Sequence, residues 1–276
     1  MSHLLNCTAA LAVSLLPLLA ACRTPAGPAA AELVLTREVA YAAEGVPLTG
    51  YLAQPADTSR PRPGVVIVHE WWGHNDYVRR RAEQLAQEGY VAFALDMYGT
   101  GKTASHPQDA GAFMQEVMGN AAVMEARFRA ALAVLRGVEG VDPERTGALG
   151  YCMGGGIVLR MARATDELDA VASFHGSLGA ALGVPDTGGA KAVFLAHGAA
   201  DPFVANETLA ALEAELKASP AIREVVVASY PGVTHGFTNP AATQKGVEFD
   251  LPLCYDADAD AQSWRTTLDL FARWLR

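Results

Sequence analysis

The chain has 276 residues, of which 51% are hydrophobic and 18% charged, and its formal net charge is −9 at pH 7. An acidic chain with no basic tract lacks the electrostatic footprint of a nucleic-acid-binding protein. The four cysteines do not form a disulfide framework, and no His/Cys cluster has the spacing of metal ligands, so we expect no metal.

The amino terminus predicts export. Leu11 to Ala21 form an apolar stretch with the length of a signal-peptide core, too short to span a bilayer comfortably. The stretch ends in Leu19-Ala20-Ala21-Cys22, which resembles a bacterial lipobox, where the cysteine is acylated and becomes the first mature residue. We expect a signal peptide over 1–21, a Pro/Ala-rich tether over 22–31 and lipidation at Cys22.

This reading places the protein in the bacterial cell envelope, in the periplasm and attached to the membrane only through the lipid. Two alternatives remain open at this stage. The first is ordinary signal cleavage near Ala29-Ala30-Ala31, and the second is a buried amphipathic helix.

Residues 32–276 predict one α/β domain, because apolar strands alternate with amphipathic helices. The pattern indicates a mostly parallel, doubly wound sheet that opens with a β-hairpin over 33–41 and 46–52. Core strands are expected over 64–69, 91–95, 146–150, 170–174, 192–197 and 224–230. Helices are expected over 76–88, 107–136 with a break near Gly119-Asn120, 153–164, 204–218 and 260–275. The gap between 174 and 191 is too short for a large lid, which favours small substrates.

The strand over 64–69 is followed by Glu70-Trp71-Trp72-Gly73. A carboxylate beside an apolar tryptophan pair should be desolvated, which would raise the pKa of Glu70 and let it exchange a proton with a nearby thiol. The alternative is a surface glutamate that forms an ion pair with the run Arg79-Arg80-Arg81.

The strand over 146–150 leads into Gly150-Tyr151-Cys152-Met153-Gly154-Gly155, and a helix follows at once. This is the thiol form of the nucleophile elbow, a tight turn that raises one reactive side chain above the carboxyl edge of a parallel sheet. A helix start directed at the sulfur favours the thiolate. In this architecture the backbone N–H groups of Trp71 and Met153 should form the oxyanion hole. The alternative is a buried, inert cysteine.

Two later strands end in an acid and a histidine. The strand over 192–197 precedes Asp201, and the strand over 224–230 precedes His235. The order nucleophile, acid, histidine is that of the α/β-hydrolase triad. We assign Cys152 as nucleophile, His235 as general base and then acid, and Asp201 as the group that fixes the imidazole tautomer. His175 and His197 also follow strands and are the competing histidines.

These residues carry a family resemblance. The chain resembles the dienelactone hydrolase family in His69-Glu70-Trp71-Trp72-Gly73, Asp96-Met97-Tyr98, the hexapeptide at Cys152, His197-Gly198 through Asp201, and His235-Gly236-Phe237. The resemblance implies an α/β-hydrolase fold, a Cys-His-Asp triad, a glutamate at position 70 that deprotonates the cysteine when substrate binds, and hydrolysis of a lactone ester without a cofactor.

The substrate is less clearly indicated than the reaction. The namesake enzymes hold a substrate carboxylate with arginines, but the corresponding stretches here read Gly99-Thr100-Gly101-Lys102 and Phe237-Thr238-Asn239-Pro240. Lys102 offers a point charge without the bidentate fork of arginine. We therefore expect a small neutral ester or lactone, bound near Trp72, Tyr98, Lys102 and Phe237. A non-catalytic ligand-binding lipoprotein and a redox-active thiol protein are the alternative functions.

Overall fold

A computed structural model describes residues 33–275. The predicted signal peptide, the tether and the lipidation site at Cys22 lie outside the described residues. Within the described range, no helix combines the length and the hydropathy that a membrane span requires.

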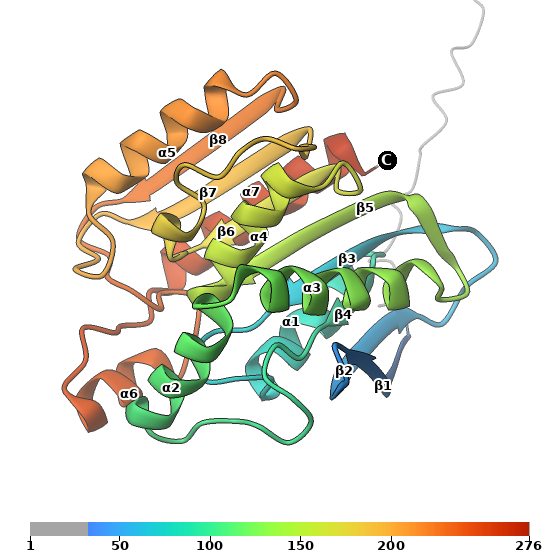
Figure 1. The fold of residues 1–276 in the computed structure, drawn as a ribbon, viewed down its shortest axis with the longest axis horizontal. Helices are drawn as coiled ribbons and strands as arrows, with labels where there is room; N and C mark the ends of the chain where they lie inside the picture. Colours follow the sequence, from blue (N-terminus) through green and yellow to red (C-terminus); the bar gives the residue numbers. More distant parts are fainter. Residues whose placement is uncertain (1–32, 276) are drawn as a thin grey trace, which may run out of the picture. The chain divides into compact units, whose positions relative to one another are not determined.

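One eight-stranded sheet forms the centre of the domain, in the order β1-β2-β4-β3-β5-β6-β7-β8 (Figure 1). Neighbouring strands from β4 to β8 run parallel, whereas β1 pairs antiparallel with β2 and β2 pairs antiparallel with β4. The strands are β1 (Val34–Ala43), β2 (Val46–Pro55), β3 (Arg62–Val68), β4 (Val91–Ala94), β5 (Val141–Tyr151), β6 (Ala170–Phe174), β7 (Ala192–Gly198) and β8 (Glu224–Tyr230). This confirms the mostly parallel sheet with an opening hairpin.

Helices cover both faces of this sheet (Figure 1). They are α1 (Asp76–Gln87), α2 (Pro107–Met118), α3 (Ala121–Arg136), α4 (Met153–Ala164), α5 (Asn206–Ala218), α6 (Ala242–Phe249), α7 (Ala257–Trp274) and the short 3₁₀ helix η1 (Leu178–Ala180). Only η1 lies between β6 and β7, so the described chain has no large lid at that position.

The two faces are built from alternate residues of the strands, because successive side chains of a strand point to opposite sides. In β3, Val66 and Val68 join the core beneath α3, α4 and α5. Val65 and Ile67 join the core beneath α1 and α7. A strand that is apolar on both sides can only be central, which places the carboxyl end of β3 in the middle of one sheet edge.

Several element boundaries differ from the prediction. β5 begins at Val141 instead of position 146, because Val141 pairs with Arg62 ahead of a register shift between Pro63 and Gly64. α7 begins at Ala257 instead of position 260, because the side chain of Asp256 caps it by accepting the Ala259 N–H. The eight-residue helix α6 was not predicted. The break between α2 and α3 was predicted, and the Asn120 side chain caps α3 there.

Candidate active site

Cys152 lies between β5 and α4 in a strained turn. Its backbone φ and ψ are 54° and −118°, a conformation that residues other than glycine rarely adopt and that is often found at functional sites. The turn closes tightly, since a Cβ at Gly150 would lie 2.2 Å from the Gly154 carbonyl oxygen. A Cβ at Gly154 would lie 2.3 Å from the Val68 oxygen. The glycines therefore allow β3, β5 and α4 to converge at the base of the thiol.

The acid and the histidine meet at this turn. Asp201 follows β7 and His235 follows β8, and His235 Nδ1 lies 2.7 Å from Asp201 Oδ2. The second carboxylate oxygen of Asp201 accepts the Phe203 N–H at 2.8 Å. His235 and Cys152 line the same cavity. The structure thus brings the three predicted triad residues together, with the imidazole between carboxylate and sulfur.

The protonation of His235 is decided by opposing effects. Burial lowers the pKa of the imidazole, but the interaction with a negatively charged Cys152 and the hydrogen bond that His235 donates to Asp201 outweigh it and raise the pKa to about 10. A pKa of about 10 keeps the His235 imidazole protonated at neutral pH.

Glu70 is buried, with 5% of its surface exposed. Its Oε2 accepts a hydrogen bond from Asn239 Nδ2 at 2.6 Å. Burial raises the pKa of the Glu70 carboxyl, although the Asn239 bond and the charge of His235 act in the opposite direction. The surface ion pair with the arginine run does not form, because Arg81 instead binds Asp260 at 2.5 Å.

The predicted oxyanion-hole residues flank the sulfur. Met153 is the first residue of α4, where a backbone N–H has no acceptor within its own helix. Trp71 follows Glu70 in the loop after β3, and the Tyr98 hydroxyl donates to the Trp71 carbonyl oxygen at 3.0 Å. Tyr98 thus holds this loop against the elbow.

The competing histidines lie behind the triad. His175 is fully buried, its Nε2 is 2.8 Å from the Thr238 hydroxyl, and its ring packs edge-on to His235 at 5.0 Å. Burial and the charge of His235 hold the pKa of His175 well below its usual range, so it stays neutral. Burial also lowers the pKa of His197. Neither histidine has the Asp201 contact that His235 makes.

A cavity of about 220 Å³ opens beside the sulfur. We call it the thiol cavity. Apart from Cys152 and His235, its wall carries no ionisable side chain. It is lined by Trp71, Met114, Cys152, Ser177, Phe203, His235 and Leu253. The wall is thus mainly apolar, and its ionisable groups are confined to Cys152 and His235.

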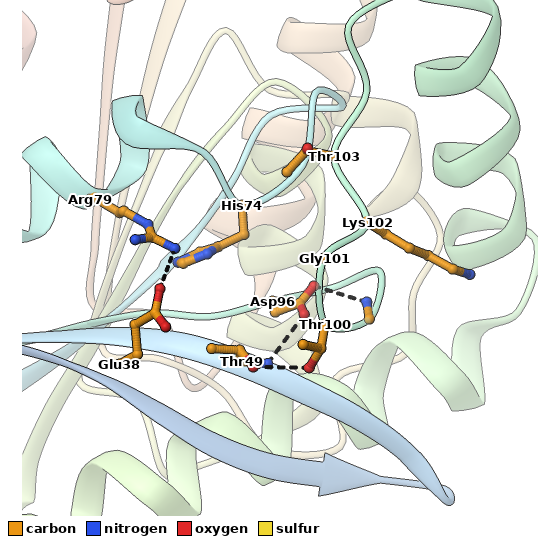
Figure 2. Close-up of a pocket in the computed structure, with 10 residues that line it drawn as sticks. Glu38, Thr49, His74, Arg79, Asp96, Thr100, Gly101, Lys102 and Thr103 are labelled. Carbon is orange, nitrogen blue, oxygen red and sulfur yellow. Dashed lines mark hydrogen bonds and ion pairs between the residues drawn. The ribbon is translucent and has the colours of Figure 1, made fainter.

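The four residues predicted to bind substrate do not belong to this wall. Trp72, Tyr98 and Phe237 are buried behind it, with at most 3% of their surface exposed. Lys102 lines a different cavity, and its Nζ lies 3.6 Å from a carboxylate oxygen of Glu116. Figure 2 shows this second cavity, with the Lys102 side chain extending away from His74 and Arg79. None of the four lines the thiol cavity, and their contact with substrate stays a prediction.

Several wall residues were not predicted. Met114 comes from α2, Phe203 from the loop after β7, and Leu253 from the segment between α6 and α7. The one available signal was the spacing of Phe203, two residues beyond the predicted acid. Asn239 lies 169 positions from Glu70 along the chain, and no sequence pattern pairs them.

Two further features of the described residues bear on cofactors and redox chemistry. Between residues 33 and 275, no three His, Cys, Asp or Glu side chains are grouped so that they could hold a metal ion. Cys152 and Cys254 are both free thiols, and Cys254 is exposed, with its sulfur 3.6 Å from the Thr243 hydroxyl.

A family model and two known proteins match most of this chain. The model of the family described as "Dienelactone hydrolase family" matches residues 48–275. "Protein usf" of Aquifex pyrophilus is 29% identical over 242 residues, which cover 86% of this chain and 98% of that protein. An Aquifex aeolicus protein, whose name proposes a carboxymethylenebutenolidase, is 27% identical and covers the same shares.

A solved structure is similar over the same region. The crystal structure of a dienelactone hydrolase-like promiscuous phosphotriesterase from metagenomic libraries is 31% identical, covers 88% of this chain and 99% of its own, and superposes with a TM-score of 0.77. The fold described above is therefore the α/β-hydrolase fold of these proteins, as the sequence predicted.

Proposed function

We propose, from the premise that this chain belongs to the dienelactone hydrolase family and is a carboxylic ester hydrolase, that it cleaves small neutral esters or lactones through an acyl-cysteine. The observation that carries this proposal is the alignment of Asp201, His235 and Cys152 at the strained turn. The absence of Lys, Arg, Asp and Glu from the wall of the thiol cavity supports the neutral substrate.

In the acylation step, the Cys152 thiolate attacks the carbonyl carbon, and the oxyanion is stabilised by the N–H groups of Trp71 and Met153. The carbon–oxygen ester bond breaks, and the His235 imidazolium gives its proton to the leaving alkoxide. In the second step, His235 takes a proton from water, the hydroxide attacks the thioester, and the carbon–sulfur bond breaks. The products are one carboxylic acid and one alcohol for each water consumed.

Glu70 acts on the protonation of the thiol in this proposal. Glu70 is buried, accepts a hydrogen bond from Asn239 and interacts electrostatically with His235, and its raised pKa suits it to accept the thiol proton when substrate binds. Asn239 then positions Glu70 without neutralising it.

The test is trapping of the acyl-enzyme. Wild-type protein incubated with 4-nitrophenyl acetate should release 4-nitrophenolate and gain one acetyl group on Cys152 by mass spectrometry, and iodoacetamide should abolish both. Cys152→Ala should show neither. If Cys152→Ala retains wild-type turnover, the nucleophile is another residue.

Neutral phosphotriesters form a second class of candidate substrate. The uncharged wall of the thiol cavity suits a triester as well as it suits a carboxylic ester, and the 31% identical structure is that of a promiscuous phosphotriesterase. Turnover of diethyl 4-nitrophenyl phosphate that is lost in Cys152→Ala would establish this activity, and no release of 4-nitrophenolate above the Cys152→Ala background would exclude it for that substrate.

The two alternative functions make distinct predictions. A redox thiol protein would consume peroxide and would need Cys254 as a resolving cysteine, so Cys254→Ser would stop it. A non-catalytic binding protein would hydrolyse no activated ester. Ester turnover that survives Cys254→Ser and is lost in Cys152→Ala would contradict both.

The proposed location is the cell envelope, through lipidation at Cys22. Cys22→Ser should move the protein from the membrane fraction to the soluble fraction or leave it unprocessed, whereas Cys254→Ser, which changes a cysteine in the folded domain, should not. Wild-type protein recovered from the cytosol with Met1 intact would contradict both signal-peptide readings.

A further inference from the structure

A second hollow adjoins the thiol cavity and shares part of its wall. It is a groove of about 320 Å³, which we call the side groove. Ser177, Phe203 and His235 line both hollows, whereas Cys152 and Trp71 line the thiol cavity only. The rest of the side groove is formed by Met118, Leu178, Gly179, Ala180, Val204 and Thr208.

The proposed reaction divides a substrate between these two hollows. The acyl carbon must bond to Cys152, with its oxygen near the Trp71 N–H, so the acyl part belongs in the thiol cavity. The leaving oxygen must lie within hydrogen-bond reach of His235, because His235 protonates it. The alcohol part continues from that oxygen, and the side groove begins at His235.

The walls of the side groove are attached to the triad by hydrogen bonds. The Ser177 N–H, just before η1, donates to the Cys152 carbonyl oxygen at 3.0 Å. The Phe203 N–H donates to Asp201 at 2.8 Å, and the Phe203 ring packs edge-on to His235 at 5.1 Å. A groove fixed in this way is formed before substrate arrives, so binding in it carries little ordering cost.

The wall chemistry limits what can bind there. Apart from His235, no residue that lines the side groove is ionisable, and its side chains are mainly apolar, with the hydroxyls of Ser177 and Thr208. Resting on the proposed function, we propose that the side groove binds the leaving alcohol of the substrate. It selects uncharged aryl or branched alkyl alcohols that are large enough to extend past His235.

Helix α2 supplies a matched pair of residues for the test. Met114 and Met118 lie four positions apart, on one face of the helix. Met114 lines the thiol cavity and Met118 lines the side groove. The same substitution to tryptophan at each position should therefore obstruct a different part of the substrate.

The experiment measures kcat/KM with two series of esters. The alcohol series consists of vinyl, phenyl and 1-naphthyl acetate, and the acyl series consists of vinyl acetate, butanoate and hexanoate. Met118→Trp should lower the ratio of 1-naphthyl to vinyl acetate by about tenfold, the usual scale for loss of a pocket contact, while the order within the acyl series is kept. Met114→Trp should lower kcat/KM for the esters with longer acyl chains, while the order of kcat/KM within the alcohol series is kept.

Thr208→Trp, which enters the side groove from α5, should repeat the effect of Met118→Trp. Thr266→Trp on α7, outside both hollows, should change neither series. Circular dichroism confirms that each variant is folded, and a misfolded Met118→Trp leaves Thr208→Trp to decide. If folded side-groove variants keep the wild-type alcohol ratio, or change the acyl order instead, the assignment is overturned. Wild-type protein that hydrolyses none of these esters overturns the proposed function itself.

Discussion

The cavity shown in Figure 2 and the thiol cavity adjoin the same loop after β3, but their polar groups are used differently. The cavity of Figure 2, which we call the polar cavity, is the larger, with about 320 Å³ against about 220 Å³. Most of its charged groups have partners: Arg79 binds Glu38 at 2.9 Å, Lys102 lies 3.6 Å from Glu116, and Asp96 accepts N–H bonds from Thr49, Tyr98 and Gly99.

The thiol cavity has few polar groups, and its two ionisable ones are Cys152 and His235, with Asp201 hydrogen-bonded to His235. The Cys152 sulfur faces an apolar wall. Charged groups that already have partners have little capacity left for chemistry, whereas a buried chain of proton-transfer groups is the arrangement typical of an active site.

The largest effects should come from breaking the chain in the thiol cavity. His235→Ala removes the proton carrier, and Asp201→Asn permits the wrong imidazole tautomer, for which a fall of about 10⁴ in kcat is established in a related triad. Ester turnover by purified variants measures both. The control in the polar cavity is Arg79→Ala, which should stay near wild-type activity, and His197→Gln should do far less than His235→Ala. Equal losses from all four would mean that the loops had collapsed.

The next largest effect should come from the charge of the substrate, which should change kcat/KM by about tenfold. An anionic substrate would place an unpaired charge in a cavity with an uncharged wall, which is costly. Neutral esters should therefore exceed their carboxylated analogues in kcat/KM by at least about tenfold, which corresponds to about 1.4 kcal/mol. Lys102→Ala alters only the polar cavity and should leave neutral substrates nearly unaffected. A preference for the anionic dienelactone that disappears in Lys102→Ala would show that the lysine reaches the substrate.

The pH profile should show the raised pKa of His235. Because the imidazolium is the proton donor in acylation and its pKa is raised to about 10, kcat/KM should fall as the pH rises through about 10. In Asp201→Asn the residual activity should fall at lower pH, since one of the interactions that raise this pKa is gone. Initial rates between pH 7 and 11 measure this fall for the wild type and for the variant. If the fall occurs at the same pH in both, it reports the titration of a group other than His235.

The smallest effect concerns stability. Burial raises the pKa of Glu70, so the folded state binds this proton more tightly than the unfolded state does. Between the unfolded and the folded pKa, the free energy of unfolding therefore falls as the pH rises, by about 1.4 kcal/mol for each unit of pKa difference. Glu70→Gln should raise Tm at pH 8, at about 2–4 °C per kcal/mol, and the gain should vanish below about pH 4. Thermal unfolding at both pH values measures it.

The sequence predicted what is local or lies directly at a strand end. The elbow at Cys152 is a contiguous motif, and Asp201 and His235 each follow an apolar strand whose position in a parallel sheet places its carboxyl end at the common edge. These residues could be assigned because chain order and strand polarity together determine where they lie.

What the sequence did not predict depends on contacts between distant segments. Glu70 and Asn239 pair across 169 positions, and the wall residue Met114 comes from a helix whose orientation no sequence period reveals. Helix α6 has eight residues and no capping side chain, so it lacked a start signal. Lys102 was expected at the substrate because of its place in the sequence, but its loop places the amine beside Glu116.

The close approach of Gly150 and Gly154 also determines how this protein can be altered in the laboratory. Any side chain at Gly150 would collide with backbone, which cannot move aside without shifting both β5 and α4. In a randomised library, changes at these glycines should therefore appear among the insoluble clones and not among clones with new selectivity. The wall residues Met114, Met118 and Thr208 lie on helix surfaces that border open space. Directed evolution of substrate preference should begin with them and leave the elbow untouched.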